Sequence, residues 1–135
     1  MFERHDYLFE GFDFNSPIQK NDIEKVEERL GIKFPDDYFH FMLKTNGGEG
    51  CIGENSYLRL WKIEELIESN EDYSVEEFAP GLIIVGSNGG GTAYGFDFRN
   101  GKPMLVEVDF IGLDIESPFF NTDNFWEFIE YLYKY

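Results

Sequence analysis

The serine, cysteine and histidine residues of this chain lack the spacing that nucleophilic catalysis needs. A nucleophile must lie within hydrogen-bond reach of a base, and the chain has only two histidines, His5 and His40, and one cysteine, Cys51. Ser87 lies in a glycine-rich run without the G-x-S-x-G pattern of a nucleophile elbow. Neither histidine has a thiol or carboxylate at metal-ligand spacing. We therefore expect no catalytic residue, no metal site and no cofactor.

The glycine-rich run at residues 86–91 (GSNGGG) invites comparison with a phosphate-binding loop. Such a loop needs a strand before it and a helix after it, whose N-terminal amides face the anion. Here the residues that follow, 92–98, have the pattern of a strand, and no lysine ends the run. The sequence therefore predicts a turn between two strands.

Carboxylates are the one reactive group that the chain has in abundance. Among 27 acidic residues, some must lie within the ~5–10 Å that separates the catalytic pair of a glycosidase, so proximity alone does not indicate catalysis. Asp97 stands out because it lies in a strand between Phe96 and Phe98, where a half-buried carboxylate needs a partner such as Arg99. We expect a structural role for Asp97. A hydrolase would need two carboxylates in a deep pocket, with pKa values driven apart.

An acidic segment with aromatic neighbours is the best candidate for a binding surface. Residues 63–79 contain no base, and tyrosine and tryptophan are frequent anchors of interfaces. The alternative is a solvated helix face, because isolated surface charges contribute little to affinity. The predicted partner-binding residues are Trp61, Glu68, Glu71, Asp72, Tyr73, Glu76 and Glu77.

The charge of the whole chain indicates the kind of partner. The formal net charge is −16, and residues 63–135 carry 15 acidic against 3 basic side chains. Nucleic-acid phosphates bind by exchanging counterions for lysine and arginine, so this charge argues against direct nucleic-acid binding. It favours a basic protein partner, although surplus negative charge can also serve solubility alone.

Length and composition predict one domain over residues 1–135. The length falls in the size range of a single domain, and no run approaches the ~20 apolar residues of a membrane span. A lone cysteine cannot form an internal disulfide. We expect a cytoplasmic protein with no membrane contact, acting as a monomer or weak dimer.

Periodicity and capping signals predict two helices in the first half of the chain. The first begins with Asn21 as its cap and ends at Gly31; the second starts at Pro35 and ends at Asn46. Before them, the aromatic residues between Tyr7 and Phe14 fit either a short edge strand or a loop.

The second half predicts strands and two further helices. Residues 57–61 alternate as a strand, and a helix with Ile63, Leu66 and Ile67 on its apolar face follows. Residues 82–85 (LIIV) indicate a central strand covered on both sides. Asn100-Gly101 predicts a hairpin of residues 92–98 with 103–109, which pairs Phe96 with Leu105 and Ala93 with Val108. Leu113 and Ile115 suggest a further edge strand. A last helix, capped by Thr122 or Asn124, should follow it. The apolar face of this helix consists of Phe125, Phe128, Ile129 and Leu132.

Four blocks of the chain, in this order, resemble the SUKH superfamily of Smi/Knr-like proteins. The first block lies between residues 16 and 48 and includes residues 23–27, 30–38 (LGIKFPDDY), 41–43 and 46–48. The other three are residues 82–91 (LIIVGSNGGG), 94–103 (YGFDFRNGKP) and 125–132 (FWEFIEYL). The resemblance implies an α+β fold with a central, mainly antiparallel sheet flanked by about four helices, in the order α-α-β-α-β-β-β-(β)-α. It also implies architectural roles for the family's recurring positions, which are matched here by Pro35, Gly47, Gly86, Gly91 and Asp97.

The resemblance also implies a function. Bacterial members of this superfamily are typically immunity proteins that bind and block a cognate polymorphic toxin, often a nuclease, whereas fungal relatives are linked to cell-wall synthesis and signalling. The superfamily has no accepted catalytic residues, and no binding residue can be carried over to this chain. We therefore expect a non-enzymatic immunity protein that binds a basic toxin through an acidic surface. The alternative is a regulatory or scaffolding adaptor for a cellular protein, as in the cell-wall-regulating relatives.

Overall fold

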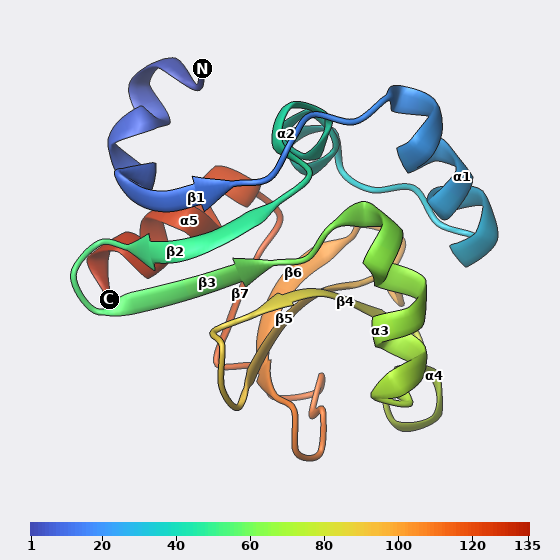
Figure 1. The fold of residues 1–135 in the computed structure, drawn as a ribbon. Coiled ribbons are helices and arrows are strands. Elements are labelled where there is room, and N and C mark those ends of the chain that lie inside the picture. Colours follow the sequence, from blue (N-terminus) through green and yellow to red (C-terminus); the bar gives the residue numbers. More distant parts are fainter.

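A single seven-stranded antiparallel sheet forms the centre of the computed structural model, which describes all residues 1–135 (Figure 1). Each strand pairs with the next one in the chain, so the strand order is the chain order. The strands are β1 (Gly11–Phe14), β2 (Gly48–Ile52), β3 (Ser56–Leu60), β4 (Leu82–Ser87), β5 (Thr92–Asp97), β6 (Met104–Asp109) and β7 (Phe120–Thr122). The predicted α+β class with an antiparallel sheet is confirmed.

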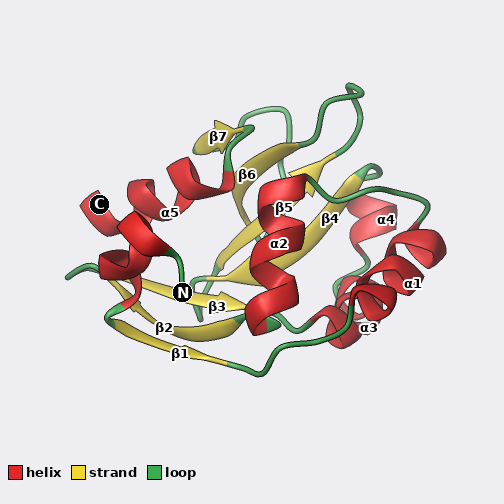
Figure 2. Cartoon of the chain, turned by 90° about the horizontal axis from the view of Figure 1, so that it is seen from above, coloured by secondary structure: helices red, strands yellow, loops and turns green.

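Helices surround the sheet, and there are more of them than expected. They are the 3₁₀ helices η1 (Glu3–Phe9) and η2 (Ile63–Glu65), and the α-helices α1 (Lys20–Leu30), α2 (Asp36–Thr45), α3 (Leu66–Asp72), α4 (Val75–Phe78) and α5 (Phe125–Lys134). Figure 2 shows α2 and α5 side by side over the same face of the sheet. No helix combines the length with the apolar character that crossing a membrane would require.

Two hydrophobic cores lie against the two faces of the sheet. The larger one joins the sheet to η1, α1, α2 and α5 and contains most of the buried aromatic side chains. The smaller one lies between β4, β5 and β6 on one side and α4 with the loop after β6 on the other. β4 contributes side chains to both cores, because Val85 points into the larger core and Ile84 points into the smaller one. The prediction that residues 82–85 form a central strand covered on both sides is confirmed.

The hairpin of β5 and β6 has the predicted register but a different turn. Phe96 pairs with Leu105 and Ala93 with Val108, as the sequence indicated. The ladder ends at Asp97 and Met104, so a six-residue connection replaces the two-residue turn, and only Gly101 in it has a positive φ, 82°. The predicted strands 92–98 and 103–109 would also pair Phe98 with Pro103, and this part of the prediction is wrong. Proline has no N–H to donate, and the N–H of Phe98 donates to the carbonyl of Gly81 instead.

The first strands show where local sequence signals were insufficient. Phe12 and Phe14 form the edge strand β1, one of the two predicted alternatives, whereas Tyr7 and Phe9 lie in η1, a helix that was not predicted. β2 was not predicted, because three of its five residues are glycine or cysteine and none continues an alternating pattern. A Cβ atom at Gly50 would lie 2.3 Å from the carbonyl oxygen of Gly11, so this strand needs glycine where β1 approaches closely.

Helix ends agree with the predictions in part. Gly31 ends α1 in a left-handed conformation with φ 72°, as expected, but Gln19 rather than Asn21 caps its start. The acidic region from Ile63 onward forms η2, α3 and α4 instead of one helix. α3 and α4 are separate because Ser74, between them, adopts a left-handed φ of 53° that a continuous helix cannot contain.

The C-terminal helix carries the predicted apolar face. Asn124 caps it by accepting a hydrogen bond from the N–H of Glu127, and the four residues of the predicted stripe are all buried. The proposed edge strand at Leu113 and Ile115 is wrong: Leu113 has a left-handed φ of 43° and buries its side chain in the smaller core. The edge position belongs to β7.

Candidate protein-binding surface

Three aromatic side chains from distant parts of the chain form one stack. The ring centroids of Trp61 and Tyr73 lie 6.2 Å apart, those of Tyr73 and Phe110 lie 4.5 Å apart, and both pairs are stacked. Trp61 follows β3, Tyr73 ends α3, and Phe110 follows β6. We call these three residues the aromatic stack. Its middle member, Tyr73, is 48% exposed, so the stack presents a tyrosine to solvent on an otherwise packed support.

Backbone hydrogen bonds fix each member of the stack. The N–H of Trp61 donates to the carbonyl of Val85 at 2.9 Å, and that of Phe110 donates to Gly91 at 2.9 Å. The N–H of Tyr73 closes the last turn of α3 by donating to Ser69. The two rings that flank Tyr73 are therefore attached to the sheet by backbone hydrogen bonds, and Tyr73 itself is attached to α3.

A buried asparagine attaches α3 to the centre of the sheet. The side chain of Asn70 accepts a hydrogen bond from the N–H of Ile84 at 2.8 Å and donates to the carbonyl of Ile84 at 2.9 Å. It also donates to the carbonyl of Leu66. β3 pairs with β4 only at residues 86 and 87, so Asn70 satisfies the backbone groups that β3 leaves unpaired. Asn70 thereby sets the position of Tyr73 three residues later.

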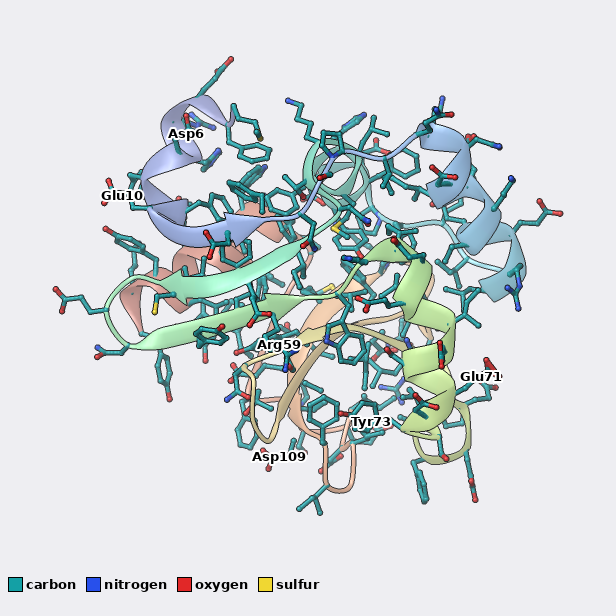
Figure 3. All side chains as sticks on the ribbon, in the orientation of Figure 1. Asp6, Glu10, Arg59, Glu71, Tyr73 and Asp109 are labelled. Atoms are coloured by element: carbon teal, nitrogen blue, oxygen red, sulfur yellow. The ribbon has the colours of Figure 1, made fainter.

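The acidic residues that the sequence grouped together lie in two places. Glu68 and Glu71 line a hollow between α1 and α3, together with Lys25 and Arg29 on α1. Figure 3 shows Glu71 on the side of α3 that faces away from the sheet, and Tyr73 on the side toward Arg59. Asp72, Glu76 and Glu77 surround the turn between α3 and α4; all three are exposed and none forms an ion pair. The structure therefore brings Trp61 and Tyr73 into contact and places Asp72, Glu76 and Glu77 around the turn that contains Tyr73. Glu68 and Glu71 lie apart from them, beside α1.

Sequence reasoning missed two residues of this surface. Phe110 completes the aromatic stack, and Ile111, beside it at the tip of the next turn, is 94% exposed. Two large apolar residues followed by Gly112, directly after a predicted strand, were the only available signal. Exposed apolar groups rimmed by charge are typical of interaction sites.

The uncovered half of the sheet continues the surface beyond Trp61. An open hollow extends from Trp61 over the outer faces of β1, β2 and β3. Within it, Tyr57 donates a 2.5 Å hydrogen bond to Glu49, which raises the pKa of Tyr57, and Arg59 lies 3.7 Å from the same carboxylate. Tyrosine, tryptophan and arginine are the side chains most enriched at interface hot spots.

The groups considered for catalysis do not meet. The ring of His5 stacks on Trp126 at 4.2 Å, His40 is exposed on α2, and Cys51 is exposed on β2. No histidine forms a hydrogen bond with a serine or cysteine, and no three His, Cys, Asp or Glu side chains cluster as a metal site would. The glycine-rich run is the turn between β4 and β5, as predicted, and the side chain of Asn88 accepts hydrogen bonds from the amides of Gly90 and Thr92.

Asp97 has the predicted partner. Its carboxylate accepts hydrogen bonds from the backbone N–H of Arg99 at 3.0 Å and from the guanidinium of Arg99 at 2.9 Å. Arg99 also pairs with Glu116 and so links the end of β5 to the loop after β6. These hydrogen bonds hold the pKa of Asp97 below its ordinary value.

Replacing Asp97 by asparagine should therefore destabilise the fold more at neutral pH than at acidic pH. Because its pKa is lowered on folding, Asp97 contributes fully above its ordinary pKa of 3.8, and the contribution is lost as the pH falls through the folded-state value. We expect Asp97→Asn to cost about 1–3 kcal/mol near pH 7, with a smaller difference below about pH 4. Urea unfolding of both proteins across this range measures the effect. A pH-independent difference would contradict the assignment.

Two comparisons with known proteins bear on this architecture. A family model described as the SMI1 / KNR4 family (SUKH-1) matches residues 17–131, which include every strand except β1 and all of α1 to α4. The chain is also similar to "Uncharacterized protein YnaB" of Bacillus subtilis (strain 168), with 32% identity over 123 residues that cover 84% of this chain and 75% of the relative.

Proposed function

The chain belongs to the SMI1/KNR4 family (SUKH-1), and on that basis we propose that it is an immunity protein, which binds a cognate toxin in the cytoplasm and neutralises it. The toxin would be a basic protein domain, and a nuclease fits this description best. Binding would use the aromatic stack and the carboxylates around it. No reaction is assigned to the chain in this proposal.

The observation that carries the proposal is the exposed aromatic stack beside unpaired carboxylates. Tyr73 is half exposed on a support fixed by backbone hydrogen bonds, and Asp72, Glu76 and Glu77 have no basic partner within the chain. An aromatic anchor on a rigid support loses little conformational entropy on binding. Charges that have no internal partner remain available to a ligand. The combination suits a protein partner with a positively charged surface.

The charge of the chain supports a nuclease as the target. A nuclease is cationic where it holds nucleic acid, so a protein of net charge −16 can approach the same surface as a polyanion does. Attraction of this kind accelerates encounter by up to about 10–10³-fold. A neutralising protein benefits from fast association, because it must reach the toxin before the toxin reaches its substrate.

Co-expression with the toxin tests the proposal. Candidate toxins are host proteins that co-purify with this chain and that arrest growth when expressed alone. We expect co-expression of the unchanged chain to restore growth, and the purified chain to inhibit the toxin's activity in vitro. We expect Tyr73→Ala to weaken binding about 30-fold, the change that corresponds to a hot spot of about 2 kcal/mol.

Tyr7→Ala is the matched control for this experiment. Tyr7 is 45% exposed, close to the value for Tyr73, but it lies on η1 and contacts Tyr133 rather than the aromatic stack. We expect this variant to protect cells fully. A partner that binds without losing activity would instead identify the chain as an adaptor. Absence of rescue with every co-purified growth-arresting protein would refute the immunity function.

A further inference from the structure

A small polar hollow lies where the last turn of α5 meets β5 and β6. Its volume is about 300 Å³. Four tyrosine side chains, from β3, β5 and the C-terminal end of α5, line it together with one carboxylate, and none of its lining residues is basic. The lining residues include Tyr94, Glu107, Tyr131 and Tyr135. We call this hollow the tyrosine pocket; it shares no residue with the aromatic stack.

Glu107 is a half-buried carboxylate without a counterion. It lies on β6 between Tyr94 of β5 and Phe120 of β7 in the ladder. One carboxylate oxygen accepts a 2.7 Å hydrogen bond from the hydroxyl of Tyr131. No lysine, arginine or histidine forms an ion pair with it. Partial burial removes some of the water that would otherwise solvate this carboxylate. A cation from outside the protein could stabilise the carboxylate in place of that water.

Tyr94 contributes a second oxygen to the pocket. The residue is 3% exposed, and its ring packs edge-on against Phe128 in the larger core. Its hydroxyl lines the hollow and makes no hydrogen bond within the protein. A phenol oxygen that has no partner within the protein and faces the hollow can accept a hydrogen bond from a molecule in the pocket.

The walls of the pocket are held in place before any ligand arrives. Tyr131 stacks face to face on Phe120, with ring centroids 3.8 Å apart, and meets Tyr135 edge-on at 5.6 Å. Burial, together with the charge of Glu107, raises the pKa of both Tyr94 and Tyr131. The two phenols therefore stay neutral near pH 7 and keep their hydroxyl groups for hydrogen bonding.

We propose that the tyrosine pocket binds the cationic end of a ligand, a guanidinium or an ammonium group, with Glu107 as its counterion. The donors of such a group match the free oxygen of Glu107 and the hydroxyl of Tyr94. Aromatic walls favour cations through their negative ring faces. An anion would meet a carboxylate and no base. The proposal goes beyond the neutralising function and does not depend on it.

Titration of the ¹⁵N-labelled full chain with capped arginine (N-acetylarginine amide) tests the proposal by NMR. We expect saturable shifts of the amide signals of residues around the pocket, and weak or no shifts with the citrulline analogue, which has the same shape but no charge. Agmatine provides a second arm: tighter binding of agmatine indicates a small diffusible cation, whereas equal or tighter binding of capped arginine indicates a side chain of a protein. Both results support the site.

Glu107→Gln is the decisive variant, because it keeps the shape and the acceptor for Tyr131 and removes only the charge. We expect it to weaken binding of capped arginine by about tenfold or more, while Glu24→Gln, an exposed position on α1, has no effect. Tyr94→Phe should weaken binding but keep the preference for arginine over citrulline. Equal binding of both probes, or unchanged affinity in Glu107→Gln, would overturn the proposal.

Discussion

Reversing the charge of Glu71, Asp72, Glu76 and Glu77 to lysine should slow association with a basic toxin by about 10- to 100-fold at low salt. The four side chains are exposed on α3 and α4, and the substitution replaces four negative charges within four residues of Tyr73 by positive ones. Long-range attraction acts mainly on the rate of encounter, so the association rate should change more than the dissociation rate. Rapid-mixing or biosensor measurements at several salt concentrations give both rates.

The salt dependence of the association rate provides the stricter test. Added salt screens charges beyond roughly 10 Å, so the unchanged chain should associate more slowly as salt rises, and the variant much less so. The matched control reverses four other exposed acids, Glu10, Glu24, Glu28 and Glu54, none of which forms an ion pair. This control has the same net charge. If it slows association as strongly, overall charge rather than this surface steers the encounter.

The division of the acidic residues in the structure allows a finer comparison. Glu68 and Glu71 face the hollow beside α1, whereas Glu76 and Glu77 lie on α4, three and four residues after Tyr73. We expect reversal of Glu76 and Glu77 to weaken the bound complex as well as its formation, because these charges lie near the anchor. Reversal of Glu68 and Glu71 should affect the rate of formation alone. The opposite result would move the contact surface to the hollow between α1 and α3.

Replacing Asn70 by alanine should destabilise the fold by about 2–5 kcal/mol. The substitution leaves both the N–H and the carbonyl of Ile84 without a partner in the interior, and each unsatisfied buried group costs about 1–3 kcal/mol. Ile84 is fully buried at the centre of the sheet, so water cannot replace the lost bonds without opening the smaller core. Urea or thermal unfolding measures the change.

Two further variants show whether the effect has this cause. Asn21→Ala changes an exposed asparagine of α1 that makes no side-chain hydrogen bond, and we expect a change within about 0.5 kcal/mol. Asn70→Asp keeps the acceptor for the N–H of Ile84 but loses both donors and buries a charge, so it should also destabilise strongly. A loss below about 1 kcal/mol in Asn70→Ala would show that the bonds to Ile84 are not needed.

The sequence by itself determined the elements whose signals are local. Alternation, helical spacing and turn chemistry act between residues that are close in the chain. They were sufficient to predict the register of β5 with β6, the central position of β4, the glycine that ends α1 and the apolar face of α5. The partner of Asp97 was also within reach, because Arg99 is two residues away. Trp61 and Tyr73 were identified as anchors by residue type, and that role remains a prediction.

Only the tertiary structure decided which distant segments meet. β2 forms despite its glycines because β1 and β3 pair with it on both sides, and Leu113 leaves the predicted strand because burial of its side chain fixes a left-handed backbone. Several contacts join residues that are far apart in the chain and that no helical or strand periodicity connects. They are the stacking of Phe110 on Tyr73, the hydrogen bonds of Asn70 with Ile84 and the hydrogen bond of Tyr131 to Glu107. Burial and hydrogen bonding in the interior depend on how the whole chain packs. A pattern of neighbouring residues therefore cannot predict which distant side chains will meet.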